Sequence, residues 1–211
     1  MKLYAYRLDH DYGLAPNPFA GYCTLAVCKT KIRHSRNLEI GDWIIGTGSK
    51  VLERKFKRSL VHRLIYIMQV SEKMTFESYW LDPRFQCKKP VMNGSLITMF
   101  GDNFYHKDEN GAWIQENSAH SNRDGTCNMD HLRQDTNGEN VLIAEHFFYF
   151  GNSAVSIPTE FHGIICKGIG QKMSKGQIID NFIAWVKRNH NPGVNDTPIN
   201  WLEFSQLNLA F

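Results

Sequence analysis

The sequence predicts an α+β protein with a bent, mostly antiparallel sheet or β-barrel and a few flanking helices. Short apolar strands follow one another early in the chain with few helices between them, which disfavours a doubly wound parallel sheet. One strongly amphipathic helix stands near the C-terminus. The hydrophobic fraction of 42% and the charged fraction of 21% are those of a globular protein.

Apolar and alternating runs predict six strands, at residues 2–8, 22–28, 43–47, 61–70, 141–150 and 161–166. Residues 48–60 are polar and basic, so we expect a mobile connection there. The segment from 82 to 140 is rich in Gly, Asn, Asp, Ser and His, with hints of order only at 95–100 and 112–115. A weakly ordered run of that length inside a compact domain is typical of a functional insertion.

Two helices have recognisable starts. Thr75 is positioned to cap a short helix that runs to about Leu81. Ser174 and Gln177 have the spacing of a capping box. The apolar stripe that follows them continues to Val186 and predicts the helix near the C-terminus.

We expect a single domain over residues 1–211. Residues 1–151 would form its strand-rich core, with the functional insertion at 82–140, and residues 152–211 would pack on that core as a strand and a helix. The N-terminus lacks the features of a signal peptide, and no stretch approaches the roughly 20 apolar residues of a membrane span. These features predict a cytoplasmic protein that makes no membrane contact.

Cysteine usage and charge give weaker indications. The cysteines are odd in number and irregular in spacing, which favours a reducing compartment over a disulfide framework. Cys23 and Cys28 fall in a predicted strand, and we expect both to be core residues. The net charge of +3 is modest, yet basic residues cluster. We interpret these clusters as solvated loops, and phosphate binding is the alternative. The first cluster contains Lys29, Lys31, Arg33 and Arg36, and the second contains Lys50, Arg54, Lys55, Lys57, Arg58 and Arg63.

Two loops in the first quarter of the chain have compositions suited to ligand binding. The Pro-stiffened loop at 11–19 presents Tyr12, Asn17 and Phe19, whose rings and amide suit a base. The alternative is a rigid connector with Phe19 in the core. In the second loop, Gly46–Ser49 ends a buried strand with glycines that admit a ligand and with hydroxyls; crowding relief at Gly46 is the alternative.

The third loop runs from Asp82 to His106. Its basic residues suit a phosphate, its aromatic residues can stack on a base, and its Asp and Asn can read a base edge. An extended surface loop pinned by aromatics is the alternative. The residues concerned are Arg84, Lys88, Lys89, Asp102, Asn103, Tyr105 and Trp113.

These loops resemble one known family. The motifs are Tyr12-Gly13-x-Ala15-Pro16-Asn17-Pro18-Phe19, Gly21-Tyr22-Cys23-Thr24-Leu25-Ala26, Gly41-Asp42-Trp43, Gly46-Thr47-Gly48-Ser49, Asp82-Pro83-Arg84-Phe85 and Gly101-Asp102-Asn103-x-Tyr105-His106. Over about residues 1–151 the chain is similar to the nucleotide modification associated domain 2 family. The resemblance implies a link to modified nucleotides in bacterial or phage systems and carries over no catalytic residue. The Gly-Asp-Trp turn also resembles PUA-like domains, at fold level alone.

The leading hypothesis is therefore a module that binds a nucleotide or a nucleic acid with a modified base, in a concavity where the three loops converge. Its candidate ligand-binding residues are Tyr12, Asn17, Phe19, Trp43, Thr47, Gly48, Ser49, Arg84, Lys88, Lys89, Asp102, Asn103, Tyr105 and His106. One alternative is an enzyme acting on nucleotides or on bases in DNA, with Asp102 or His106 as the acid–base group. Another is a protein-interaction component of a bacterial or phage defence system, with a protein partner.

No cofactor or metal is expected. The chain lacks the paired motifs of zinc deaminases, the phosphate loop of P-loop proteins and the nucleophile elbow of α/β-hydrolases. His120, Cys127 and His131 are three potential zinc ligands without a fourth.

Overall fold

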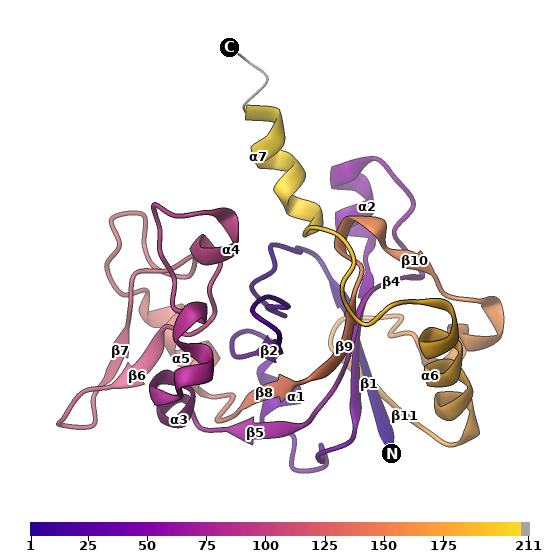
Figure 1. Ribbon diagram of the computed structural model, residues 1–211, viewed down its shortest axis with the longest axis horizontal. Coiled ribbons are helices and arrows are strands. Elements are labelled where there is room, and N and C mark those ends of the chain that lie inside the picture. The colour runs from indigo at the N-terminus through magenta and orange to yellow at the C-terminus, as the bar shows by residue number, and fades with distance from the viewer. Residues whose placement is uncertain (208–211) are drawn as a thin grey trace. The chain divides into compact units, whose positions relative to one another are not determined.

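A computed structural model describes residues 1–207. The chain forms two compact units. The first unit comprises Met1–Tyr12, Leu38–Val70 and the chain from Glu145 onward, and the second comprises Gly13–Asn37 and Ser71–Ala144. Figure 1 shows the elements of both units by label.

The first unit contains an open, mixed sheet in the order β11-β1-β3-β4-β9-β12, with β10 paired to β4. The strands β1/β3 and β9/β12 are parallel, and the other pairs are antiparallel. The α+β class is confirmed, and the barrel alternative is not realised because the edge strands β11 and β12 do not pair. The strands are β1 Lys2–Leu8, β3 Trp43–Gly48, β4 Arg63–Gln69, β9 His146–Tyr149, β10 Val155–Ser156, β11 Gln171–Lys175 and β12 Gly193–Val194.

The core of this unit lies between one face of the sheet and α6 (Gln177–Asn189). Alternate residues of the strands, among them Leu3, Trp43 and Ile67, share this core with the apolar stripe of α6. The remaining elements of the unit are α2 Lys50–Phe56, η2 Gly151–Ser153, η3 Thr159–Ile164, η4 Ile199–Trp201 and α7 Leu202–Leu207.

The second unit holds a three-stranded antiparallel sheet, β2-β8-β5, and the hairpin β6-β7. Thr75 caps α3 by accepting a hydrogen bond from the amide of Ser78, as predicted. The elements are β2 Cys23–Leu25, α1 Thr30–Arg33, β5 Glu72–Met74, α3 Phe76–Leu81, η1 Pro83–Lys88, α4 Leu96–Met99, β6 Tyr105–Lys107, β7 Trp113–Gln115, α5 Met129–Thr136 and β8 Val141–Ala144.

Two predicted elements differ from the structure. The expected mobile connection at 48–60 contains α2, which Ser49 caps through the amide of Leu52. The predicted strand at 161–166 is the 3-10 helix η3, whose buried Phe161 and Ile164 are three residues apart, as the pitch of that helix requires. The order hinted at 95–100 and 112–115 is confirmed by α4 and β7.

Two further differences concern the ends of elements. The capping box is not formed: Ser174 is paired with Leu3 in the sheet, so α6 begins only after Gly176, whose φ of 91° turns the chain. The predicted strand at 141–150 is two strands separated by a bend at Glu145, and each strand belongs to a different unit. Among the helices within residues 1–207, none combines the length and the apolar character needed to cross a membrane.

Candidate active site

The chain between β2 and α1 places a cysteine in an unusual backbone conformation. Cys28 and Lys29 have φ values of 55° and 41°, which L-residues rarely adopt in succession. Such residues cost on the order of 1–3 kcal/mol each and persist where the surroundings fix them. Here the amide of Cys28 donates to Asp135 Oδ1 (2.6 Å), and its carbonyl accepts from Arg33 Nε (2.7 Å). Both polar groups of the Cys28 backbone are therefore held.

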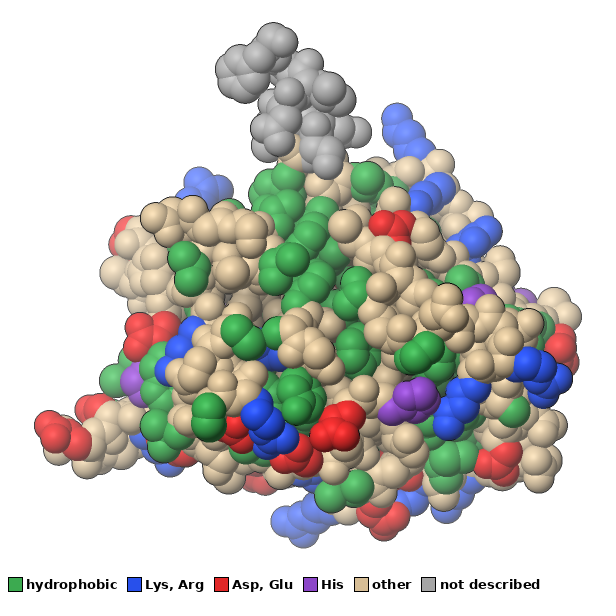
Figure 2. Space-filling view, viewed as in Figure 1, with side chains coloured by type: hydrophobic (Ala, Val, Ile, Leu, Met, Phe, Trp, Pro, Cys, Tyr) green, Lys and Arg blue, Asp and Glu red, His purple; other side chains and the backbone are tan. Residues whose placement is uncertain are grey.

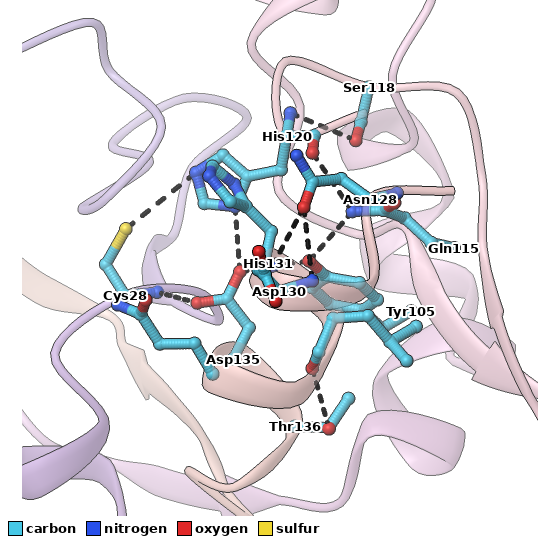
Figure 3. A network of polar contacts seen from close by, with 12 residues as sticks. Cys28, Tyr105, Gln115, Ser118, His120, Asn128, Asp130, His131, Asp135 and Thr136 are labelled. Carbon is cyan, nitrogen blue, oxygen red and sulfur yellow. Dashed lines mark hydrogen bonds and ion pairs between the residues drawn. The ribbon is translucent and has the colours of Figure 1, made fainter. Parts of the chain in front are cut away.

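A histidine lies between the thiol and the same carboxylate (Figure 3). His120 Nδ1 is 2.7 Å from Asp135 Oδ2, and His120 Nε2 is 3.9 Å from Cys28 Sγ. Because an ionised carboxylate only accepts, Nδ1 carries the proton of that bond and Nε2 faces the sulfur. Cys28, His120 and Asp135 thus form a thiol–imidazole–carboxylate series, the arrangement of nucleophilic catalysis.

Hydrogen bonds from the β6-β7 hairpin fix the histidine and the carboxylate. Tyr105 Oη donates to Asp135 Oδ2 (3.0 Å). Gln115 Nε2 donates to Tyr105 Oη (3.0 Å) and to the carbonyl of His120 (3.3 Å). Gln115 Oε1 accepts from the amide of Asn128 (2.6 Å), the cap of the helix that carries Asp135. One glutamine therefore ties the His120 loop to the start of α5.

A buried arginine closes the other side. The guanidinium of Arg33 donates to the carbonyls of Asp135 (2.5 Å) and Asn140 (3.0 Å), and it lies 4.0 Å from Asp135 Oδ1. Its side chain is wholly buried. A Cβ on Gly138 would lie 2.3 Å from Arg33 Cζ, so only glycine leaves room for the guanidinium at this position.

The electrostatics favour a charged pair. Burial lowers the pKa of His120, but its contacts with Asp135 and Cys28 outweigh burial and raise that pKa to about 9. Burial raises the pKa of Asp135, whereas His120, the Cys28 amide and Arg33 lower it, and the net shift is downward. At neutral pH the site therefore holds an imidazolium and a carboxylate, and Nε2 of the imidazolium faces the sulfur of Cys28.

The thiol and the imidazole belong to partly exposed residues. Cys28 is half-buried, and the side chain of His120 is 12% exposed. The exposed His131 packs edge to face on His120, with ring centroids 4.4 Å apart, and burial and the charge of His120 lower its pKa. His131 is therefore a neutral base beside a charged acid. Within residues 1–207, no group of three or more His, Cys, Asp and Glu side chains is arranged to hold a metal ion.

Tyr105 is the one predicted ligand-binding residue in this cluster. It contributes its hydroxyl, while its ring is 1% exposed and so is covered on both faces. The sequence analysis missed Cys28, His120 and Asp135 as a set. The expectation that Cys28 is a core residue is wrong, because β2 ends at Leu25 and Cys28 lies beyond it, half-buried. Cys23 is in the core, as expected.

Four of the predicted residues meet in a buried polar network of the second unit. Lys88 Nζ donates to Asn17 Oδ1 (2.7 Å) and to the carbonyls of Asn17 and Tyr22. Asp102 accepts from Thr24 (2.6 Å) and from Tyr79, and Asn103 donates to two backbone carbonyls. Burial lowers the pKa of Lys88 and raises that of Asp102. This network fastens the loops to one another.

The other predicted residues of the second unit lie nearer the surface. Arg84 forms ion pairs with Glu72 (2.6 Å) and Asp82 (2.8 Å), and Phe19 is half-buried. His106 stacks on Trp80 with centroids 4.0 Å apart and planes 10° apart, and Lys89 Nζ is 3.3 Å from the Trp80 ring centroid. An ammonium cannot share a face with a ring stacked that closely, so Lys89 and His106 occupy opposite faces of the indole.

The predicted residues of the first unit have structural partners. Trp43 is in the core, Thr47 Oγ1 donates to the carbonyl of Tyr6 (3.4 Å), and Ser49 caps α2. The carbonyl of Tyr12 accepts from Trp201 Nε1 (3.0 Å). A Cβ on Gly48 would lie 2.2 Å from the carbonyl oxygen of Leu60. Backbone, rather than open space, therefore faces this glycine.

Comparison with known proteins gives one match. The family model of nucleotide modification associated domain 2 matches residues 1–205. No curated protein and no solved structure matches the chain. The name of the family indicates an association with nucleotide modification. Since the match spans nearly the whole sequence, the chain belongs to the nucleotide modification associated domain 2 family.

Proposed function

We propose that this protein is an enzyme that acts on a nucleotide, or on a base in DNA, by nucleophilic catalysis through Cys28. The observation that carries this proposal is the double role of Asp135, which binds both the amide of Cys28 and the ring of His120. One carboxylate thus fixes the nucleophile's backbone and the orientation of its acid–base partner. Family membership supports the substrate class.

The chemistry follows from the three side chains. The Cys28 thiolate attacks the carbonyl carbon of an acyl group carried by an amino group of the base; the S–C bond forms and the C–N bond to the amino group, which is the leaving group, breaks. The imidazolium of His120 gives its proton to the leaving group. Water then attacks the thioester carbon while His120 accepts the water's proton, and the carboxylic acid and the Cys28 thiolate are released. Asp135 acts as a positioning residue throughout.

The first test compares cysteines within one molecule. Cys87 is exposed and has no histidine partner, whereas Cys28 is half-buried beside His120. Exposure alone predicts faster alkylation of Cys87 by iodoacetamide. An activated thiolate predicts that Cys28 reacts faster at pH 7, by at least about tenfold, the equivalent of 1.4 kcal/mol. Peptide mass spectrometry over a time course measures both rates in the same sample.

Variants separate activation from accessibility. His120→Gln removes the cation and should bring Cys28 to the rate of Cys87 or below, while Cys127→Ser should leave both rates unchanged. Turnover of p-nitrophenyl acetate should acetylate Cys28. A panel of nucleotides and modified DNA oligomers should contain a substrate that the wild type turns over and that the Cys28→Ser variant does not. If Cys87 reacts faster than Cys28 in the wild type, the thiol is not activated and the proposal fails.

A second candidate function is nucleotide binding at Trp80. A cavity of about 340 Å³ is lined by Trp80, Lys89, Pro90, Met92, Glu116 and Asn117. If Lys89 swings off the indole, it frees a face on which a base can stack and keeps a cation for a phosphate. Lys107 over Trp113 (5.0 Å) is the matched control, since those two residues do not line this cavity. Lys89→Gln, but not Lys107→Gln, should abolish stabilisation by nucleotides in thermal unfolding; equal effects would exclude the cavity.

A further inference from the structure

Two arginines of the first unit line the same cavity. Arg58 follows α2, and Arg63 begins β4. Arg58 Nη1 donates to the carbonyl of Asn152 (2.9 Å), and Arg63 Nη1 donates to the carbonyl of Ala154 (2.9 Å). The Nε and Nη2 atoms of Arg58 are buried and have no hydrogen-bond partner among residues 1–207. Buried N–H groups of a charged side chain are costly to leave unpaired.

No acidic side chain within residues 1–207 forms an ion pair with either arginine at 4.0 Å or less. Asp196, whose charge acts on Arg58, already accepts from Ser153 Oγ (2.6 Å) and from the amide of Thr197 (2.7 Å). Burial, and then the like charge of Arg63, lower the pKa of Arg58, whereas the charges of Asp196 and Asp11 raise it, and the net shift is downward. The positive charge of the two arginines is therefore only partly balanced by nearby carboxylates.

The surrounding backbone holds both arginines in place. Glu53 Oε2 accepts from the amides of Leu60 (2.9 Å) and Val61 (3.1 Å), which folds the turn after α2 back on the helix. Arg63 pairs with Ser156 across β4 and β10. Arg58 and Arg63 line a cavity of about 450 Å³ together with the segment 152–154, whose carbonyls at Asn152 and Ala154 accept hydrogen bonds from them. The backbone around the cavity is fixed, and the side chain of Arg58 must turn for its buried Nε and Nη2 to reach a ligand.

We propose that this cavity binds a phosphate group, held by Arg58 and Arg63. The unpaired Nε and Nη2 of Arg58 lie on one edge of its guanidinium, the edge that forms two parallel hydrogen bonds with a phosphate. Exposed Lys50, Arg54 and Lys57 on and after α2 make the approach electropositive, and Lys and Arg side chains gather over this part of the surface (Figure 2). This site belongs to the first unit and does not depend on Cys28.

The phosphate can come from a free nucleotide or from a nucleic acid backbone, and titration distinguishes the two. Inorganic phosphate should raise the melting temperature of the full chain above that in chloride at equal ionic strength. Arg58→Gln should abolish this rise, whereas Lys57→Gln, which removes the same charge from an exposed position, should preserve it. Arg63→Gln tests the same cavity through its second guanidinium if the first variant fails to fold.

A labelled DNA duplex identifies the source. If the phosphate belongs to DNA, Arg58→Gln should weaken binding about tenfold or more and reduce the slope of log affinity against log salt by about 1, while Lys57→Gln has a smaller effect on affinity. If it belongs to a nucleotide, the affinity for ADP falls instead and DNA binding is unchanged. The proposal is overturned if phosphate, ADP and DNA bind the Arg58→Gln and Arg63→Gln variants as they bind the wild type.

Discussion

The raised pKa of His120 makes the stability of the protein depend on pH in a way that a substitution can isolate. A histidine whose pKa is higher in the folded chain than in the unfolded chain stabilises the fold below the unfolded value and loses that contribution as pH rises through the folded value. Here the pKa rises from 6.5 to about 9. The stabilisation is therefore complete below about pH 6.5 and is lost by about pH 9.

The magnitude follows from the same two values. A span of about 2.5 pH units at about 1.36 kcal/mol per unit gives about 3 kcal/mol. Urea unfolding at pH 6, 7.5 and 9.5 measures this contribution as the difference in unfolding free energy between the wild type and His120→Gln, since groups that do not interact with His120 titrate equally in both. The advantage of the wild type should shrink by about 3 kcal/mol across this range.

Two controls assign the effect to the Asp135–His120 pair. In a Cys28→Ser background the thiol cannot contribute, and a part of the pH-dependent difference should persist because Asp135 still raises the pKa of His120. The difference in unfolding free energy between the wild type and His131→Gln should be nearly constant between pH 7.5 and 9.5. Burial lowers the pKa of His131, so that its ring is neutral throughout this pH range. A constant difference between the wild type and His120→Gln at all three pH values would refute the reasoning.

Two further substitutions test the scaffold of the site. Gly138→Ala places a Cβ 2.3 Å from Arg33 Cζ. This overpacking should destabilise the protein by roughly 1–3 kcal/mol or more, and it should also slow the alkylation of Cys28. Unchanged urea unfolding would show that Arg33 moves freely. Thr75→Ala removes the cap of α3 and should cost about 1 kcal/mol without changing the reactivity of Cys28; a change in that reactivity would mean that α3 positions the site.

The sequence predicted those parts of the fold whose signal is local. The strand at residues 2–8 and the cap at Thr75 are confirmed. Helix capping depends on neighbours in the chain, whereas the predicted alternation of the strand is not seen, because residues 3–6 are all buried. The strand predicted at 161–166 is wrong because Phe161 and Ile164 pack against the helix α6, which no local pattern reveals. Ser174 has the composition of a cap, yet pairing with β1 decided its conformation.

The candidate site lay outside local reasoning for a different reason. Cys28 and Asp135 are 107 positions apart, and His120 lies 92 positions from the thiol. A catalytic series of this kind is defined by geometry and not by spacing. The predicted site residues were drawn from glycine-rich and aromatic loops, where several of the polar side chains, such as Lys88 and Asp102, satisfy one another within the unit.

The buried network around Lys88 and the cluster around Asp135 differ in what they leave open. Lys88 Nζ donates to Asn17 Oδ1 and to the carbonyls of Asn17 and Tyr22. Each of these bonds joins two segments of the same chain. At Asp135 both carboxylate oxygens are also occupied, yet His120 Nε2 points at a sulfur 3.9 Å away, a long contact for a hydrogen bond. Asp135 and Arg33 thus hold the backbone of Cys28 at a positive φ, which keeps its thiol beside the charged ring of His120. A cluster that only stabilises the fold does not require a strained backbone at the cysteine. This strain supports an active site over simple packing more strongly than the identity of the three residues does.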